Sequence, residues 1–165
     1  QPQVLSPWST VRLDAFTHHY ALEYIKKKKP RLVYISYGET DDFAHDGDYE
    51  AYLKSAHQTD AFIKELWQFV QSNRRYRNKT TFLITTDHGR GYKTKADWKS
   101  HGKTYYGSNE IWMAAIGPDT LALGERAVEE KTLQSQIAKT IAQLLGHEYS
   151  NDAFEVGEVL PNIIK

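Results

Sequence analysis

The chain has 165 residues, is 40% hydrophobic and 25% charged, and carries 21 basic and 21 acidic side chains, so its formal net charge is zero. This composition is typical of a globular domain with a real core, and the balanced charge gives no nucleic-acid or membrane-surface signal. The absence of cysteine excludes disulfides and thiolate metal sites, and no apolar run approaches the length of a membrane span.

Helical and strand patterns alternate along the chain. Helices are marked by apolar residues at helical spacing and by terminal signals, such as Pro30 after a lysine run and Gly146 at a C-terminal cap position. Strands are marked by short, nearly continuous apolar runs. In chain order we expect a helix at 9–30 capped by Ser9 or Thr10, a strand at 31–37, a helix at 48–73, strands at 80–87 and 110–118, and a helix at 132–146.

This order predicts an α/β fold with a mainly parallel sheet, covered by helices on both faces, in a single domain spanning residues 1–165. The tail at 155–165 has no clear pattern. The sequence begins at "QPQVLSPW" without an initiator Met or a signal peptide, as expected for a piece of a larger protein.

Polar side chains follow two of the predicted strands where each strand ends. Ligands of open α/β sheets bind outside the carboxyl ends of the strands, so these side chains should emerge at one edge. Imidazoles and carboxylates together suit Zn²⁺ or a similar ion, and the neighbouring Gly89, Gly91 and Gly102 allow close approach of the backbone. The candidate ligands are Asp41 and His45, Asp87 and His88 in "TTDHGRG", and His101 in the following loop.

Spacing alone is weak support for a metal site. Asp14 and His18 repeat the Asp-x-x-x-His spacing inside a predicted helix, on a face that we expect to be solvated, and we predict that they are not ligands. An alternative interpretation of the acidic stretch is that Asp41, Asp42, Asp46 and Asp48 are ordinary loop residues and helix N-caps.

Two other features leave alternatives open. The basic runs at 26–31 and 73–79 are interpreted as solvated helix C-termini rather than phosphate sites. The loop at 92–106 is rich in Tyr, Trp and Lys. It could form a rim that holds a base or sugar and a phosphate, or it could pack on its own aromatic rings.

Several stretches together resemble the alkaline phosphatase superfamily, and most closely its nucleotide pyrophosphatase/phosphodiesterase branch. The resemblance covers nearly the whole chain, and the combined order of the motifs is more specific than any one of them. The stretches are "ETDDFAHDGDYEAYLKSAHQTDAFI", "TTDHGRG", "SHGKTYYGSNEIWMAAIGP" and "SQIAKTIAQLLG".

The resemblance implies a metal-dependent hydrolase of phosphate esters, of phosphodiesterase or phosphatase type, acting on a small-molecule phosphoester. It implies two divalent ions, taken to be zinc. Asp41, His45 and His101 would hold one ion, and Asp87 and His88 would help to hold the second. Two such ions stabilise the attacking and leaving oxygens of an in-line displacement. An extracytoplasmic location is implied by the resemblance only.

The chain departs from this family in lacking a further Asp ligand and the Thr or Ser nucleophile, which the family carries well upstream. We therefore interpret it as the C-terminal portion of a larger enzyme, partnered by a missing N-terminal segment, with no catalytic nucleophile of its own and no assigned substrate-binding residue. Ser9 and Thr10 fit a helix cap better than a nucleophile turn. The alternatives are a phosphomutase of the same superfamily, a sulfatase, a non-catalytic domain, or a structural α/β domain without metal.

Overall fold

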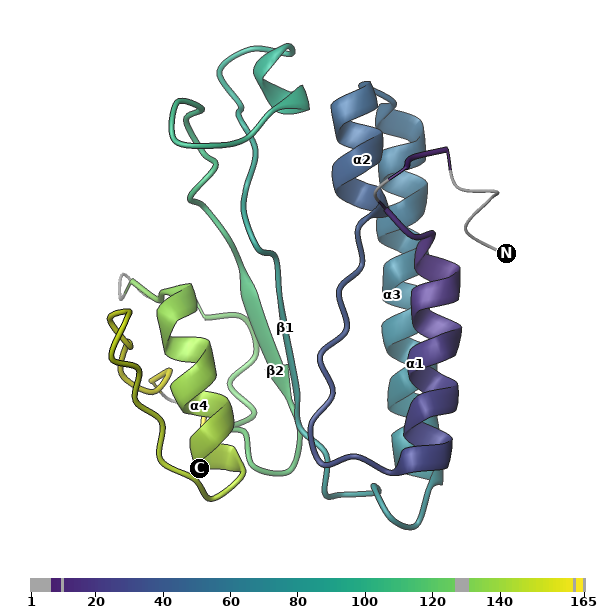
Figure 1. Cartoon of the computed structure of the whole chain (residues 1–165), viewed down its shortest axis with the longest axis vertical. Helices are drawn as coiled ribbons and strands as arrows, with labels where there is room; N and C mark the ends of the chain where they lie inside the picture. Colours follow the sequence, from purple (N-terminus) through teal and green to yellow (C-terminus); the bar gives the residue numbers. More distant parts are fainter. Residues whose placement is uncertain (1–6, 10, 127–130, 162, 165) are drawn as a thin grey trace. The chain divides into compact units, whose positions relative to one another are not determined.

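The computed structural model describes residues 7–9, 11–126, 131–161 and 163–164. The chain divides into two compact units, one formed by residues 1–74 and 88–110 and the other by residues 75–87 and 111–165. The first unit contains helices α1 to α3, and the second contains strands β1 and β2 and helix α4 (Figure 1). In the described part of the chain, no helix combines the length and the apolar character needed to cross a membrane.

Helices α1 (Asp14–Lys28) and α3 (Tyr49–Ser72) lie side by side and form the core of the first unit (Figure 1). The start of α3 matches the sequence prediction, because the side chain of Asp48 accepts a hydrogen bond of 2.9 Å from the Ala51 N–H and so caps the helix. Burying each large apolar side chain contributes about 1.5–3 kcal/mol. The buried apolar residues of the two helices are Leu22, Ile25, Phe62, Leu66 and Val70.

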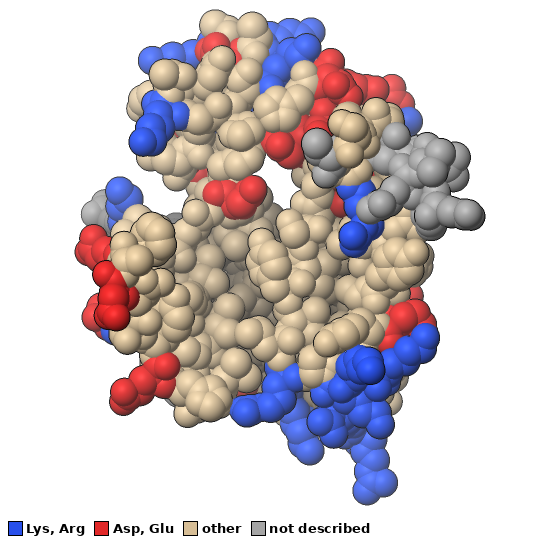
Figure 2. Space-filling model, viewed as in Figure 1, with Lys and Arg blue, Asp and Glu red and all other residues tan. Residues whose placement is uncertain are grey.

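The first helix begins later than predicted. It starts at Asp14 with Leu13 in the N-cap position, so Ser9 does not cap it, and Thr10 lies outside the described residues. The end of the helix agrees with the prediction: its last turn carries lysines 26–28, and Lys29 closes it in the left-handed conformation. Figure 2 shows these basic side chains gathered at the end of α1, where they complement the helix dipole.

Residues 39–46, which we expected to form a loop, form helix α2 (Glu39–Asp46). The helix packs against α3, and its Ala44 is fully buried. Gly47 ends it with a φ of 79°, a left-handed conformation that glycine adopts without strain. The acidic stretch is therefore neither a plain loop nor an isolated turn.

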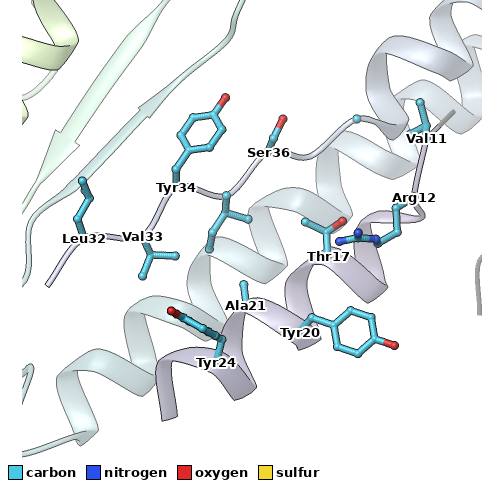
Figure 3. A pocket seen from close by; sticks show the side chains of 12 residues that line it. Val11, Arg12, Thr17, Tyr20, Ala21, Tyr24, Leu32, Val33, Tyr34 and Ser36 are labelled. Carbon is cyan, nitrogen blue, oxygen red and sulfur yellow. The ribbon is translucent and has the colours of Figure 1, made fainter. Parts of the chain in front are cut away.

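The predicted buried strand at 31–37 is extended in the structure but pairs with no strand of the described part of the chain, and it is largely exposed. Tyr34 is 88% exposed, and no hydrogen bond joins the main chain of residues 32–36 to another described residue. The segment lines one side of a groove of about 770 Å³, and Tyr20 and Tyr24 of α1 lie on the other side (Figure 3). An apolar run predicts burial only where a neighbouring strand covers it, and none does so among the described residues.

The second unit contains a two-stranded antiparallel sheet of β1 (Phe82–Thr85) and β2 (Met113–Ile116), in which Phe82 is opposite Ile116. Both strands lie within their predicted ranges. The predicted mainly parallel sheet is not seen in the described residues. A parallel pair needs a crossover connection, and only antiparallel pairing joins these two strands.

Helix α4 (Ile137–Leu144) follows a 3-10 turn at Gln134–Gln136, and Gly146 comes after it with a φ of 79°, as its predicted role as a C-cap requires. The helix binds the patternless tail through Thr140, which is fully buried and whose hydroxyl accepts a 2.9 Å hydrogen bond from the N–H of the buried Leu160. The tail is therefore part of the core of the second unit.

Candidate metal centre

Helix α2 places the Asp-x-x-x-His pair on one helical face. Positions four residues apart lie one above the other on an α-helix. Accordingly, His45 Nε2 lies 3.3 Å from Asp41 Oδ2. A loop would not fix this spacing, so the helix that the sequence analysis missed is what brings the two side chains together.

The loop at 88–110 returns on itself and brings His88 close to His101. The N–H of Gly89 donates to the Ser108 carbonyl at 2.9 Å, and the N–H of Gly91 donates to the Ser100 carbonyl at 3.1 Å. A Cβ at Gly89 would overlap the carbonyl oxygen of Gly107, and one at Gly91 would lie 2.6 Å from the carbonyl oxygen of Asp97. The expected close approach at both glycines is therefore present.

Four predicted ligands meet in the first unit. His101 Nε2 lies 3.1 Å from His45 Nε2 and 3.8 Å from Asp41 Oδ1. His88 Nε2 lies 3.7 Å from the same carboxylate oxygen, and its ring stacks on that of His101 with centroids 3.7 Å apart. Within the described residues, Asp41, His88 and His101 form a group whose ligand atoms all lie within 4.8 Å of one another.

Two of these separations match those expected around a tetrahedral ion. With metal–ligand bonds of about 2.0–2.1 Å, two ligand atoms at the corners of a tetrahedron are separated by roughly 3.3 Å. The separations of 3.1 Å and 3.3 Å about His45 Nε2 are close to this value. The distances from Asp41 Oδ1 to His88 Nε2 and to His101 Nε2 are longer, at 3.7 Å and 3.8 Å. Imidazole nitrogens with one carboxylate are a donor set suited to a borderline divalent cation.

The protonation states of the imidazoles also suit a metal. His88 Nδ1 lies 2.9 Å from the Gly89 carbonyl oxygen, an acceptor, so Nδ1 carries a proton, and Nε2 is the ring nitrogen on the side of Asp41. A hydrogen bond of this kind orients a metal-binding imidazole. Burial, followed by the charge on His88, lowers the pKa of His101 and favours the neutral form that binds metals.

Arg90 is a member of this cluster that the sequence analysis did not single out. Its Nη2 donates to Asp41 twice, to the main-chain oxygen at 2.8 Å and to Oδ1 at 2.5 Å, and its Nη1 donates to the Trp98 carbonyl at 3.3 Å. Only 12% of its side chain is exposed. The one sequence feature that could have pointed to Arg90 is its position directly after the His-Gly pair in "TTDHGRG".

Asp87 belongs to the second unit, where its main-chain oxygen accepts a hydrogen bond from the Gln134 amide. It is exposed and is not a member of the described group of Asp41, His88 and His101. The structure thus brings together four of the five ligands expected from the sequence.

Asp14 and His18, which share the same spacing, were expected on a solvated face, but both are buried. Asp14 is 2% exposed and His18 is fully buried. His18 stacks on Phe62 at a centroid distance of 4.2 Å, and its two ring nitrogens lie 3.0 Å from Tyr37 Oη and from Glu65 Oε2. Burial lowers the pKa of His18. Both ring nitrogens are occupied, so the position of His18 is that of a core residue.

The aromatic rings of the loop at 92–106 pack on one another and on α3. Trp98 meets Tyr49 and Tyr52 edge-on, each at a centroid distance of 5.4 Å. Tyr92 lies edge-on to Tyr106 at 5.2 Å. This packing favours the second of the two interpretations of the loop, in which its rings serve its own structure.

The family model described as "Metalloenzyme superfamily" matches residues 13–149, most of the chain. The chain belongs to the Metalloenzyme superfamily. The superfamily has the alkaline-phosphatase-like α/β fold, so the broad family resemblance is confirmed. Its members are metal-dependent enzymes that use divalent ions, in agreement with the cluster on α2 and the loop at 88–110. No curated protein and no solved structure shows significant similarity to the chain.

Proposed function

We propose that the chain carries most of the metal centre of a metal-dependent hydrolase of phosphate esters, of phosphodiesterase or phosphatase type. The observation that carries the proposal is the convergence of one carboxylate and three imidazoles from α2 and the loop at 88–110. Membership of the Metalloenzyme superfamily supports a catalytic rather than a purely structural use of the metal.

In this chain Asp41, His45 and His101 would hold one zinc ion, with His88 beside them. The preference for zinc follows from three nitrogen donors beside a single carboxylate. In the complete enzyme, His88 and Asp87 contribute to a second zinc site, as the resemblance to nucleotide pyrophosphatases/phosphodiesterases implies. When bound, such ions supply positive charge that stabilises the oxygens of a phosphoryl group in the transition state.

The residues of this chain have two proposed roles, metal binding and positioning of a ligand. Asp41 and the imidazoles would bind the metal ion. The Arg90 side chain holds the Asp41 carboxylate in place through hydrogen bonds to Oδ1 and to the main-chain oxygen of Asp41. The nucleophile is assigned to a segment upstream of this chain, which makes the chain the C-terminal portion of the enzyme. No residue of the chain is assigned to substrate binding.

Metal binding is the first test. Titration of the metal-free protein with Co²⁺, followed by visible absorption and competition with Zn²⁺, should give one tight tetrahedral site. His45→Ala and His101→Ala should each weaken it at least 100-fold, since each removes a ligand. His57→Ala, an exposed change on α3, should leave it unchanged. Equal affinity in the wild type and in His45→Ala would contradict the site.

Activity is the second test. The 165-residue chain with added Zn²⁺ should hydrolyse aryl phosphate mono- and diesters very poorly, because a nucleophile and a second ion that act as one unit account for many orders of magnitude in rate. A longer protein that includes the upstream segment should be active. Comparable turnover by the two proteins would place the nucleophile within this chain.

A further inference from the structure

Helices α1 and α2 both begin without a local cap. Their N-cap residues, Leu13 and Gly38, make no side-chain capping hydrogen bond. The first N–H groups of a helix have no partner within the helix, so a helix start without a local cap needs acceptors from elsewhere.

Each helix supplies the acceptor for the other. Asp14 is the first residue of α1, and its Oδ1 accepts a 2.7 Å hydrogen bond from the Gly38 N–H while its Oδ2 accepts one of 3.3 Å from the Glu39 N–H. Glu39 is the first residue of α2, and its Oε1 accepts a 2.8 Å hydrogen bond from the Asp14 N–H. The two acidic residues form a reciprocal cap across the two helices.

Burial disfavours the charge of Asp14 but does not remove it at neutral pH. Burial, offset in part by the hydrogen bond from Gly38, raises the pKa of Asp14 to about 6. The negative charges of Glu39 and Asp42 raise the pKa further. At pH 7 the carboxylate is therefore mostly ionised, and both of its oxygens accept hydrogen bonds at the positive ends of two helix dipoles.

The reciprocal cap lies one turn from the metal centre. The N–H of Asp41 donates to the Gly38 carbonyl at 3.1 Å, so Asp41 occupies the first turn that the cap fixes, and His45 follows one turn later. A Cβ at Gly38 would lie 3.0 Å from the Val11 side chain, which leaves little room for a shift. A change in the start of α2 would therefore move Asp41 relative to His88 and His101, which belong to another segment.

We propose that Asp14 and Glu39 are positioning residues that fix the start of α2 and thereby hold Asp41 and His45 in place for the metal centre. The metal-related part rests on the proposed function, whereas the ordering of α2 does not. Neither residue is a ligand.

The test compares Asp14→Ala with Asp48→Ala, because Asp48 caps α3, a helix without proposed ligands. Amide exchange of residues 41–45 is measured in the metal-free protein, together with the imidazole NMR signals of His45 and His101. We expect Asp14→Ala to speed exchange in α2 at least tenfold and to shift both imidazole signals. Asp48→Ala should do neither. Co²⁺ affinity should fall 10- to 100-fold in Asp14→Ala, as for other groups that orient ligands.

Glu39 provides a second comparison if Asp14→Ala does not fold. Glu39→Gln keeps an acceptor for the Asp14 N–H and should behave as the wild type, whereas Glu39→Ala should show the faster exchange. Unchanged exchange in α2 for both Asp14→Ala and Glu39→Ala would overturn the proposal. A wild-type protein that binds no Co²⁺ would instead contradict the proposed metal centre, and the exchange data would still decide whether the cap orders α2.

Discussion

Arg90 holds Asp41 by two hydrogen bonds from one nitrogen, at 2.8 Å to the main-chain oxygen and at 2.5 Å to Oδ1. The contact joins the loop at 88–110 to α2. Its importance lies in the direction that it gives to the carboxylate: Oδ1 is fixed on the side of His88 and His101, and Oδ2 is left beside His45.

Loss of this contact should weaken metal binding without removing a ligand. We expect Arg90→Ala to lower Co²⁺ affinity about 10- to 100-fold. Arg90→Lys should not restore it, because one ammonium group cannot reproduce the planar set of donors that reaches Asp41 and the Trp98 carbonyl together. Full affinity in Arg90→Lys would show that charge alone matters.

His18 should act on stability and not on metal binding. Removing a fully buried ring that stacks on Phe62 and binds Tyr37 and Glu65 should cost about 2–5 kcal/mol in the free energy of unfolding. Urea unfolding of His18→Ala measures this loss, and its bound Zn²⁺ should equal that of the wild type. The exposed His57→Ala serves as the control and should change stability by about 0.5 kcal/mol or less. Zinc loss in His18→Ala at wild-type stability would refute the assignment.

Asp14 should make stability depend on pH in a defined window. Its usual pKa of 3.8 is raised to about 6 in the folded protein, so between these values the folded chain keeps a proton that the unfolded chain has released. Stability from this group is therefore present at low pH and is lost as the pH rises through about 6. Asp14→Asn removes the titration. The difference in unfolding free energy, wild type minus Asp14→Asn, should fall between pH 4 and pH 7, and a difference that rises would contradict the prediction.

Gly89 should tolerate no side chain. Its Cβ would overlap carbonyl oxygens of Gly107 and Glu110, so Gly89→Ala must displace the return of the loop that carries His88. We expect a loss of stability of at least about 2 kcal/mol, as for overpacking of a tight site, and weaker Co²⁺ binding. Gly124→Ala is the control, because that position has a φ of 67° but open space around it. Gly124→Ala should lower the free energy of unfolding by about 1–2 kcal/mol and leave Co²⁺ binding unchanged.

A helix could be predicted from the sequence where its repeating apolar face packs against another helix of the structure. The buried face of α3 follows from Phe62, Leu66 and Val70, and its start follows from Asp48. The start of α1 was not predictable from local signals, because its cap comes from Glu39. Helix α2 could not be predicted, because its eight residues contain too few apolar positions to show a helical repeat. Its buried residue is an alanine.

The side chains that form the cluster could be predicted from strand ends and from the family resemblance, but their arrangement could not. The proximity of His88 Nε2 to Asp41 is seen only in the structure, and the assignment of His88 and Asp87 to a second ion stays a prediction. Neither Arg90 nor the reciprocal cap could be inferred, because both depend on contacts between segments that are distant in the chain. The mainly parallel sheet stays a prediction for the family fold and is not seen in the described residues.

The extended segment at 32–36 has a consequence for handling the protein. Its exposed main-chain groups and apolar side chains form an open template on which the same segment of other molecules can align. The lysines at 26–29, with Pro30 and Arg31, immediately precede it and act as gatekeepers that oppose such stacking by repulsion between like charges. Salt screens this repulsion over distances of about 8–10 Å at moderate ionic strength. Concentrated solutions of the chain should therefore remain clear at low salt and become turbid as salt is added.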